Sequence, residues 1–221
     1  AHILALHDVG SNNPDGVDIK KAKGADGKPL DGIPFHPYYT VKDIMGAVVF
    51  LAVFCFIMFF VPEMGGYFLE HNNFIPADPL KTPEHIAPVW YFTPYYSILR
   101  AVPPIFNSQF PGVLAMGISV VIFFFLPWLD RSPVKSIRYG GRLYKIWLAI
   151  FVAVFLLLGY LGVKPTTVWG QFGFDAFFLD TKDVATWVAR LCTIVYFLFF
   201  FLMPWYTPRD KVKPVAGRVT V

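Results

Sequence analysis

Two histidines near the start of the chain are the first residues whose type suits redox or proton chemistry. His2 and His7 lie in the segment AHILALH, whose apolar residues predict the end of a helix. Their five-residue spacing corresponds to about 500° of helical rotation, so the imidazoles lie some 140° apart around the axis. They therefore cannot bind one metal ion together. Each could be a hydrogen-bonded core residue or, if the helix crosses a membrane, a functional ionisable group.

A second group of candidates lies at the ends of apolar segments. Asp43, next to Lys42, comes immediately before a long apolar run. It could cap a helix, reach toward the membrane interface, or handle a proton. The tyrosines Tyr91, Tyr95 and Tyr96 lie in an aromatic, proline-rich segment, where they could form an interfacial belt or part of a site.

The composition indicates which elements must position these residues. Of the 221 residues, 56% are hydrophobic, 19% aromatic and 15% charged, and the mean hydropathy is +0.52. A soluble domain has about 25% charged residues. Two cysteines inside apolar runs, Cys55 and Cys192, provide neither a disulfide framework nor a CxxC metal motif. The composition excludes a typical soluble enzyme and a nucleic-acid-binding protein, and indicates a membrane protein.

Four apolar runs are long enough to span a bilayer, which takes about 20 helical residues. They are residues 44–62, 112–129, 146–163 and 184–206. Arg190 lies near the start of the fourth, where it could extend toward the interface or pair inside a bundle. The fold class expected is therefore an all-α integral membrane helical bundle.

The basic residues predict an orientation for these spans. Counts of Lys and Arg in successive segments outside the spans are 5, 2, 5, 2 and 4. By the positive-inside rule, both ends lie on the cytoplasmic side. The net charge of +4 thus reports topology rather than a nucleic-acid partner.

The chain as a whole divides into three expected regions. Residues 1–10 resemble the C-terminal end of a truncated helix, with a processed mature end as the alternative. Residues 11–43 form a cytoplasmic loop, in which the polar stretch 16–32 is expected to be a flexible surface insertion. Residues 44–221 carry the spans and an outer loop, 63–111, expected to be partly helical between Pro88 and Pro103 and functional.

Three motifs resemble cytochrome b of the quinol:cytochrome c oxidoreductase (bc1) complex. They are HILALHDVGSNNP, FHPYYTVKDIMG and TPEHIAPVWYFTPYYSILRAVP, in that order along the chain. The resemblance covers nearly the whole chain and implies the second half of an eight-helix subunit. It implies the tail of helix four followed by helices five to eight.

The resemblance assigns the histidines different roles. It implies that the complete subunit holds two b-type haems, each with one histidine from the second helix and one from the fourth. His2 matches the fourth-helix ligand of the haem iron near the cytoplasmic side. The partner ligands lie outside this chain, because His36, His71 and His85 fall in loops. The fragment alone should not hold haem in its native ligation.

The resemblance also implies a quinone-reduction site of His7, Ser11, Lys42 and Asp43. Reduction of a quinone to a quinol takes two electrons and two protons, so proton donors must stand at the quinone carbonyls. His7 and Asp43 are the catalytic candidates there. Ubiquinone is the expected substrate.

A quinol-oxidation site is implied in the outer loop, where Tyr96 matches the family's quinol-site tyrosine. Its other residues form a variant of the PEWY signature, namely Pro88, Val89, Trp90 and Tyr91. Valine replaces the glutamate that accepts a proton from quinol, so the proton must leave through another group, through water, or through a nearby carboxylate such as Glu84.

The implied function is that of a catalytic subunit of quinol–cytochrome c reductase, coupling quinol oxidation to proton translocation. The implied partners are the N-terminal half of cytochrome b, the Rieske iron–sulfur protein and cytochrome c1, in a dimeric complex within the bacterial inner membrane rather than the mitochondrial one. One alternative is the fourth subunit of a b6f complex, which has three spans and no haem-ligand histidine. Another is a non-catalytic subunit or a small transporter, for which no internal repeat was found.

Overall fold

The computed structural model describes residues 1–29, 32–69, 71–83, 86–173, 181–215 and 217. It divides into two compact units. Unit 1 comprises Ala1–Pro62, Ser132–Arg142 and Asp210–Val221, and unit 2 comprises Glu63–Arg131 and Leu143–Arg209. Its described residues form helices and isolated β-bridges but no strand, which confirms the all-α fold class.

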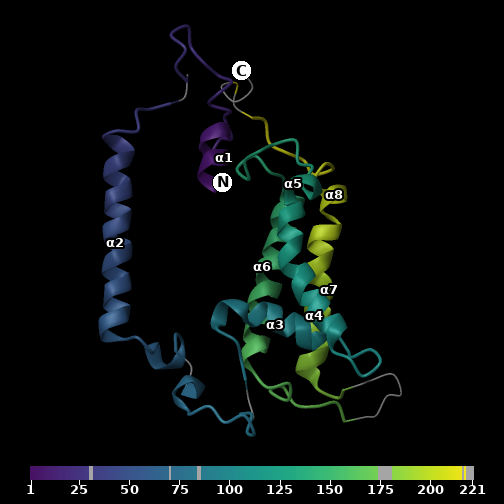
Figure 1. Cartoon of the computed structure of the whole chain (residues 1–221). Coiled ribbons are helices and arrows are strands. Elements are labelled where there is room, and N and C mark those ends of the chain that lie inside the picture. Colours follow the sequence, from purple (N-terminus) through teal and green to yellow (C-terminus); the bar gives the residue numbers. More distant parts are fainter. Residues whose placement is uncertain (30–31, 70, 84–85, 174–180, 216, 218–221) are drawn as a thin grey trace. The chain divides into compact units, whose positions relative to one another are not determined.

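Unit 1 contains α1 (His2–Val9) and α2 (Tyr38–Phe60) (Figure 1). Helix α2 begins six residues earlier than expected, with Pro37 at its N-cap. Asp43 therefore lies inside the helix, and the prediction that it could cap the helix is wrong. None of the residues of α2, all of which the structure describes, is buried.

The first half of the polar stretch 16–32 is anchored, contrary to the expectation of a flexible insertion. Val17 and Ala22 are each only 5% exposed. The preceding carboxylate of Asp15 accepts hydrogen bonds from Arg138 Nη1 at 2.6 Å and from the Tyr139 hydroxyl at 3.0 Å. A long-range ion pair and small buried side chains thus fix this segment, although its polar composition alone predicts a solvent-exposed loop.

Lys20, in the same stretch, caps the end of α1. Its ammonium donates to the backbone carbonyls of His7 and Asp8, which lie in the last turn of that helix. Cations are favourable there because helix C-terminal carbonyls are unpaired and carry partial negative charge.

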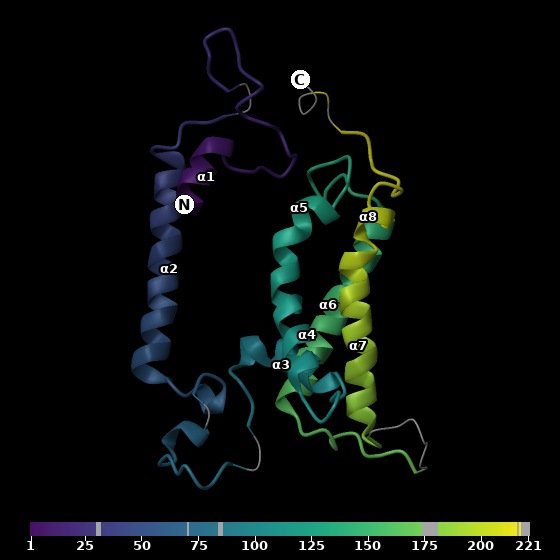
Figure 2. The ribbon, with the colours of Figure 1, turned by 45° about the vertical axis from the view of Figure 1, so that its right-hand side comes forward.

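Unit 2 contains the other three candidate spans, which run side by side in Figures 1 and 2. The first is continuous through α4 (Phe110–Val121), η4 (Ile122–Phe125) and α5 (Leu126–Leu129); the others are α6 (Arg142–Val163) and α7 (Val184–Phe201), followed by α8 (Met203–Tyr206). With α2 they make four helices long and apolar enough to cross a membrane within the described residues, as expected. Pro127 and Pro204 lie at the starts of α5 and α8, where a missing N–H is tolerated.

Aromatic side chains fill the interior of unit 2. Phe151 of α6 contacts the rings of Tyr196, Phe199 and Phe200 of α7, with centroids 4.4 to 5.5 Å apart. The buried Tyr196 hydroxyl donates to the Ser119 carbonyl at 2.7 Å, which ties α7 to α4. Such contacts hold the three spans in a fixed arrangement.

The outer loop contributes a short helix, α3 (Thr93–Ala101), preceded by η1 (Met64–Gly66), η2 (His71–Phe74) and η3 (Trp90–Phe92). Helix α3 lies across the spans of unit 2 in both views (Figures 1 and 2). Glycines permit this close approach. A Cβ on Gly162 of α6 would lie 2.0 Å from the Thr93 carbonyl oxygen, and one on Gly112 of α4 would lie 2.5 Å from that of Leu99.

Candidate functional site

The residues of the expected inner site occupy two stretches of unit 1. His7 lies in the last turn of α1 and Ser11 follows that helix, whereas Lys42 and Asp43 lie in the first two turns of α2. All four side chains are exposed. Among the residues that the structure describes, no hydrogen bond or ion pair joins these two stretches. Their polar atoms are thus accessible to a ligand.

Local contacts position some of these side chains. The Lys42 ammonium lies 5.3 Å from the ring centroid of Tyr39, one turn earlier on α2. The backbone carbonyl of His7 accepts a hydrogen bond from the Lys20 ammonium. A basic residue, a carboxyl group and an imidazole are therefore available in unit 1, on helices whose other exposed side chains are mostly apolar.

His2 lies in the first turn of α1, on a helix with an exposed apolar surface. Ile3 is 60% exposed and Leu4 76% exposed, and no residue of this fully described helix is buried. In the described part of the chain no three His, Cys, Asp or Glu side chains form a metal-binding group. His2 thus offers one imidazole beside exposed apolar surface.

The expected outer-site residues lie in unit 2, before and within α3. Trp90 and Tyr91 begin η3, and their side chains are 61% and 54% exposed. The Thr93 hydroxyl donates to the Trp90 carbonyl at 2.7 Å and so fixes the junction between η3 and α3. Val89 precedes η3 with its apolar side chain 45% exposed. The segment presents aromatic and apolar surface.

Tyr95 and Tyr96 differ in their surroundings on α3. The Tyr95 ring packs edge-on against Phe155 of α6 at 5.9 Å, and burial raises the pKa of its hydroxyl, which keeps it protonated. The Tyr96 ring carries the Arg100 guanidinium 5.3 Å from its centroid. Tyr96 is thus positioned by a cation–π contact, which the sequence motif did not reveal.

Arg100 is the main residue that the sequence reasoning missed, since it entered only the charge count. Its Nη2 donates to the carbonyls of Leu161 at 3.2 Å and Lys164 at 3.1 Å, at the end of α6. An arginine one turn after paired tyrosines in an otherwise apolar segment could have indicated it, because a charged group there needs a partner.

Arg190 pairs inside unit 2. Its Nε donates to the Ala101 carbonyl at the end of α3, at 3.0 Å, and its guanidinium lies 4.5 Å from the ring centroid of Trp187. Of the two alternatives for this residue, pairing within the bundle is therefore the one observed. Glu84, the suggested substitute proton acceptor, and His85 lie outside the described residues.

Comparison with known proteins shows what the chain as a whole is similar to. The sequence profile of the family described as "Cytochrome b(C-terminal)/b6/petD" matches residues 76–197. The chain is 56% identical to cytochrome b of Allochromatium vinosum, over 99% of this chain and 50% of that protein. It is 44% identical to cytochrome b of Rhodospirillum rubrum, over 99% of this chain and 47% of that protein.

A solved structure gives the same relationship in three dimensions. A chain of a "Hyperthermophilic respiratory Complex III" superimposes with a TM-score of 0.72 and 33% sequence identity. The match covers 93% of this chain and 45% of the solved one. This chain thus spans about half the length of the curated relatives it matches.

Proposed function

Because this chain belongs to the cytochrome b family, of which it represents the C-terminal half, we propose that it is part of the haem- and quinone-binding subunit of a bc1-type complex. The observation that carries the proposal is the extent of the match, since 99% of the chain aligns with a cytochrome b at 56% identity. That alignment includes both the inner and the outer candidate residues. The four membrane-capable helices make the chain a multi-pass membrane protein, and we place it in a bacterial inner membrane.

The residues present fit one half of a b-type haem site. His2 supplies a single imidazole on a helix whose neighbouring apolar side chains, Ile3 and Leu4, are uncovered. If haem b is bound here, His2 would hold it from this chain together with an imidazole outside the chain, and the haem would supply one-electron transfer. The role of this chain is to hold the first imidazole and to contribute apolar surface.

At the inner site, the chain's own groups bind and protonate a quinone. The Asp43 carboxyl and the His7 imidazole each can deliver one proton to a quinone carbonyl oxygen, which matches the two protons that reduction to quinol consumes. Ser11 offers a hydroxyl for hydrogen bonding, and the Lys42 ammonium favours a developing negative charge on the quinone oxygen. Ubiquinone is the substrate we propose.

At the outer site, the chain binds quinol against aromatic surface and leaves proton removal to another group. Pro88, Trp90, Tyr91 and Tyr96 form the apolar and hydrogen-bonding surface on which quinol oxidation takes place. Val89 can neither accept a proton nor hydrogen-bond through its side chain. Water or a carboxylate outside the described residues, such as Glu84, takes the quinol protons.

The same proposal defines the partners. The second haem ligands would come from the N-terminal half of cytochrome b. Of the two electrons that quinol oxidation releases, one would pass to the Rieske iron–sulfur protein and onward to cytochrome c1, and the other to the b haems. The assembly is a dimer in which this subunit couples electron transfer to proton translocation. A three-span b6f subunit does not match a chain with four candidate spans and a histidine-bearing α1.

The inner site is tested by removing its carboxyl proton. Asp43→Asn preserves the shape of the side chain but cannot donate a carboxyl proton, so turnover limited by quinone reduction should fall on the order of 100-fold. The measurement is reoxidation of reduced b haem by added quinone in the purified complex. Haem content should stay unchanged.

Asp26→Asn is the matched control, because Asp26 is an exposed carboxylate whose nearest charged partner is Lys28. It should leave quinone reduction intact. Normal quinone reduction in Asp43→Asn would contradict the assignment of Asp43 as a proton donor.

A further inference from the structure

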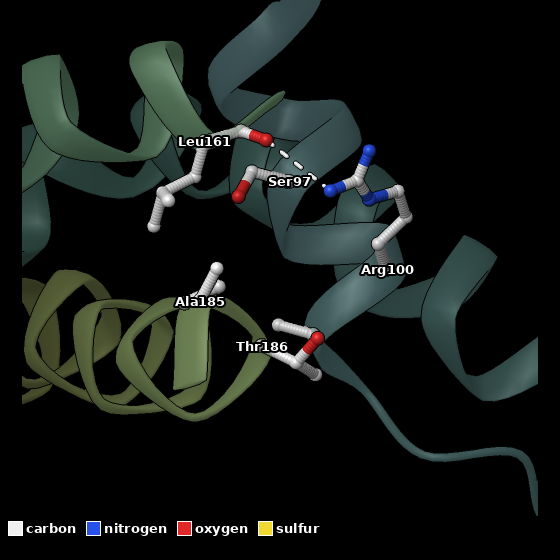
Figure 3. A pocket seen from close by; sticks show the side chains of 7 residues that line it. Ser97, Arg100, Leu161, Ala185 and Thr186 are labelled. Carbon is white, nitrogen blue, oxygen red and sulfur yellow. Dashed lines mark hydrogen bonds between the residues drawn. The ribbon is translucent and has the colours of Figure 1, made fainter. Parts of the chain in front are cut away.

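A small pocket lies beneath α3, between this helix and two spans of unit 2 (Figure 3). The volume open to the centre of a water molecule is about 10 Å³, which corresponds to a single water. Figure 3 shows side chains entering it from three helices. The lining consists of Ser97, Arg100 and Ala101 from α3, Leu161 from α6, and Ala185, Thr186 and Ala189 from α7.

Two buried polar atoms at this pocket have no hydrogen-bond partner among the described residues. They are the Ser97 hydroxyl oxygen and Arg100 Nε. Ser97 is 1% exposed, so bulk solvent does not reach its hydroxyl. Buried polar atoms in folded proteins are almost always paired with protein or with ordered water.

The guanidinium cannot turn to satisfy Nε elsewhere. Arg100 Nη2 is held by the carbonyls of Leu161 and Lys164, and the central carbon of the guanidinium lies 5.3 Å from the centroid of the Tyr96 ring. The Nε–H therefore requires a hydrogen-bond acceptor inside the pocket. The Ser97 hydroxyl requires a partner that can donate or accept.

Water has both properties and the right size. It can accept from Arg100 Nε and donate to Ser97 Oγ, whereas a cation would be repelled by the guanidinium. Apart from Thr186, the rest of the lining is apolar, and a volume of about 10 Å³ has no room for a larger polar ligand. Buried waters of this kind satisfy groups that the protein itself leaves unpaired.

We propose that this pocket binds one ordered water molecule that bridges Ser97 Oγ and Arg100 Nε. The water completes the hydrogen bonding of Arg100, and Arg100 in turn connects Tyr96 to the end of α6. The water thereby helps to fix α3, which carries Tyr95 and Tyr96, against α6 and α7. This inference does not depend on the proposed quinone chemistry.

The test is a structure of the assembled complex at a resolution that reveals ordered waters. A density peak should lie 2.7 to 3.2 Å from both Ser97 Oγ and Arg100 Nε. Ser97→Ala removes one hydrogen-bonding group, so the peak should be lost and the α3 amides should exchange hydrogen for deuterium faster. An empty pocket in the unaltered protein, or a peak that persists in Ser97→Ala, would overturn the proposal.

Ser119→Ala is the matched control. Ser119 is equally buried in unit 2, but its hydroxyl donates to the Met116 carbonyl within its own helix. The water peak and the α3 exchange rates should be unchanged in this variant. If both variants accelerate exchange of α3 equally, the effect comes from general loosening of the bundle and the bridging role is wrong.

Discussion

The two histidines of α1 lie on different faces of that helix, and our proposal gives them different roles. His2 and His7 share α1, yet they lie some 140° apart around it. One histidine can therefore serve a metal while the other serves a proton donor site. The sequence spacing alone predicts this separation, but not which histidine has which role.

His2→Leu should abolish the spectrum of one b haem in the assembled complex, because one axial imidazole is lost and leucine cannot replace it. The reduced-minus-oxidised absorbance of the two b haems measures this directly.

His7→Leu is the control for that experiment, because the same change is made on the other face of the same helix. Both b haems should remain, while quinone reduction should fall. Retention of both haems in His2→Leu would refute the assignment of His2 as a ligand.

At the scale of elements, the position of α3 depends on glycines that give no sequence signal of their own. A Cβ on Gly162 would meet the Thr93 backbone oxygen at 2.0 Å, whereas one on Gly159 would meet Pro94 Cγ at an ordinary 3.5 Å. A helix pattern predicts both glycines as interior positions of α6, but only the fold distinguishes them.

Gly162→Ala should displace α3 and lower the stability of the complex by about 1–3 kcal/mol, the usual cost of overpacking. The quinol oxidation rate should fall with it, since Tyr96 moves with α3. Thermal denaturation and steady-state turnover measure the two effects.

Gly159→Ala provides the comparison, since it is one turn away on the same helix and its methyl group would make only ordinary van der Waals contacts with Pro94 and Thr93. Alanine favours a helix over glycine by up to about 1 kcal/mol, so this variant should be as stable as the parent or more so. Equal destabilisation by both substitutions would show that the contact with Thr93 is not what matters.

The sequence indicated the spans well, because a bilayer demands long apolar helices whatever their neighbours. It missed the beginning of α2 at Tyr38, since the polar and aromatic residues there continue the helix beyond the apolar run. It also missed the Arg100 contacts and the anchoring of Asp15 by Arg138. These depend on partners 61 and 123 residues away in the chain, which local patterns do not encode.

At the scale of the whole molecule, the distribution of charge predicts that the polar stretch 16–32 and the outer loop lie on opposite sides of the membrane. Lys28→Cys and Leu80→Cys place thiols at two exposed positions. In sealed inverted vesicles, an impermeant thiol reagent should label Lys28→Cys and spare Leu80→Cys.

Both native cysteines are first replaced by serine or alanine, because Cys55 is exposed in this structure. Detergent should make both introduced thiols reactive, which confirms that each is accessible. Labelling of both positions in sealed vesicles would contradict the predicted topology.

The ring contacts around Phe151 have a consequence for assembly in lipid. In a bilayer, apolar side chains gain little free energy by exchanging lipid for another helix, so hydrophobicity alone does not favour the correct helix partner over an acyl chain. Aromatic rings can provide that preference. Edge-on and stacked arrangements such as those of Phe151 with Phe200 and Phe199 draw on ring quadrupoles that saturated chains lack. The ring contacts in the interior therefore favour packing of α6 against α7 over contact of either helix with lipid.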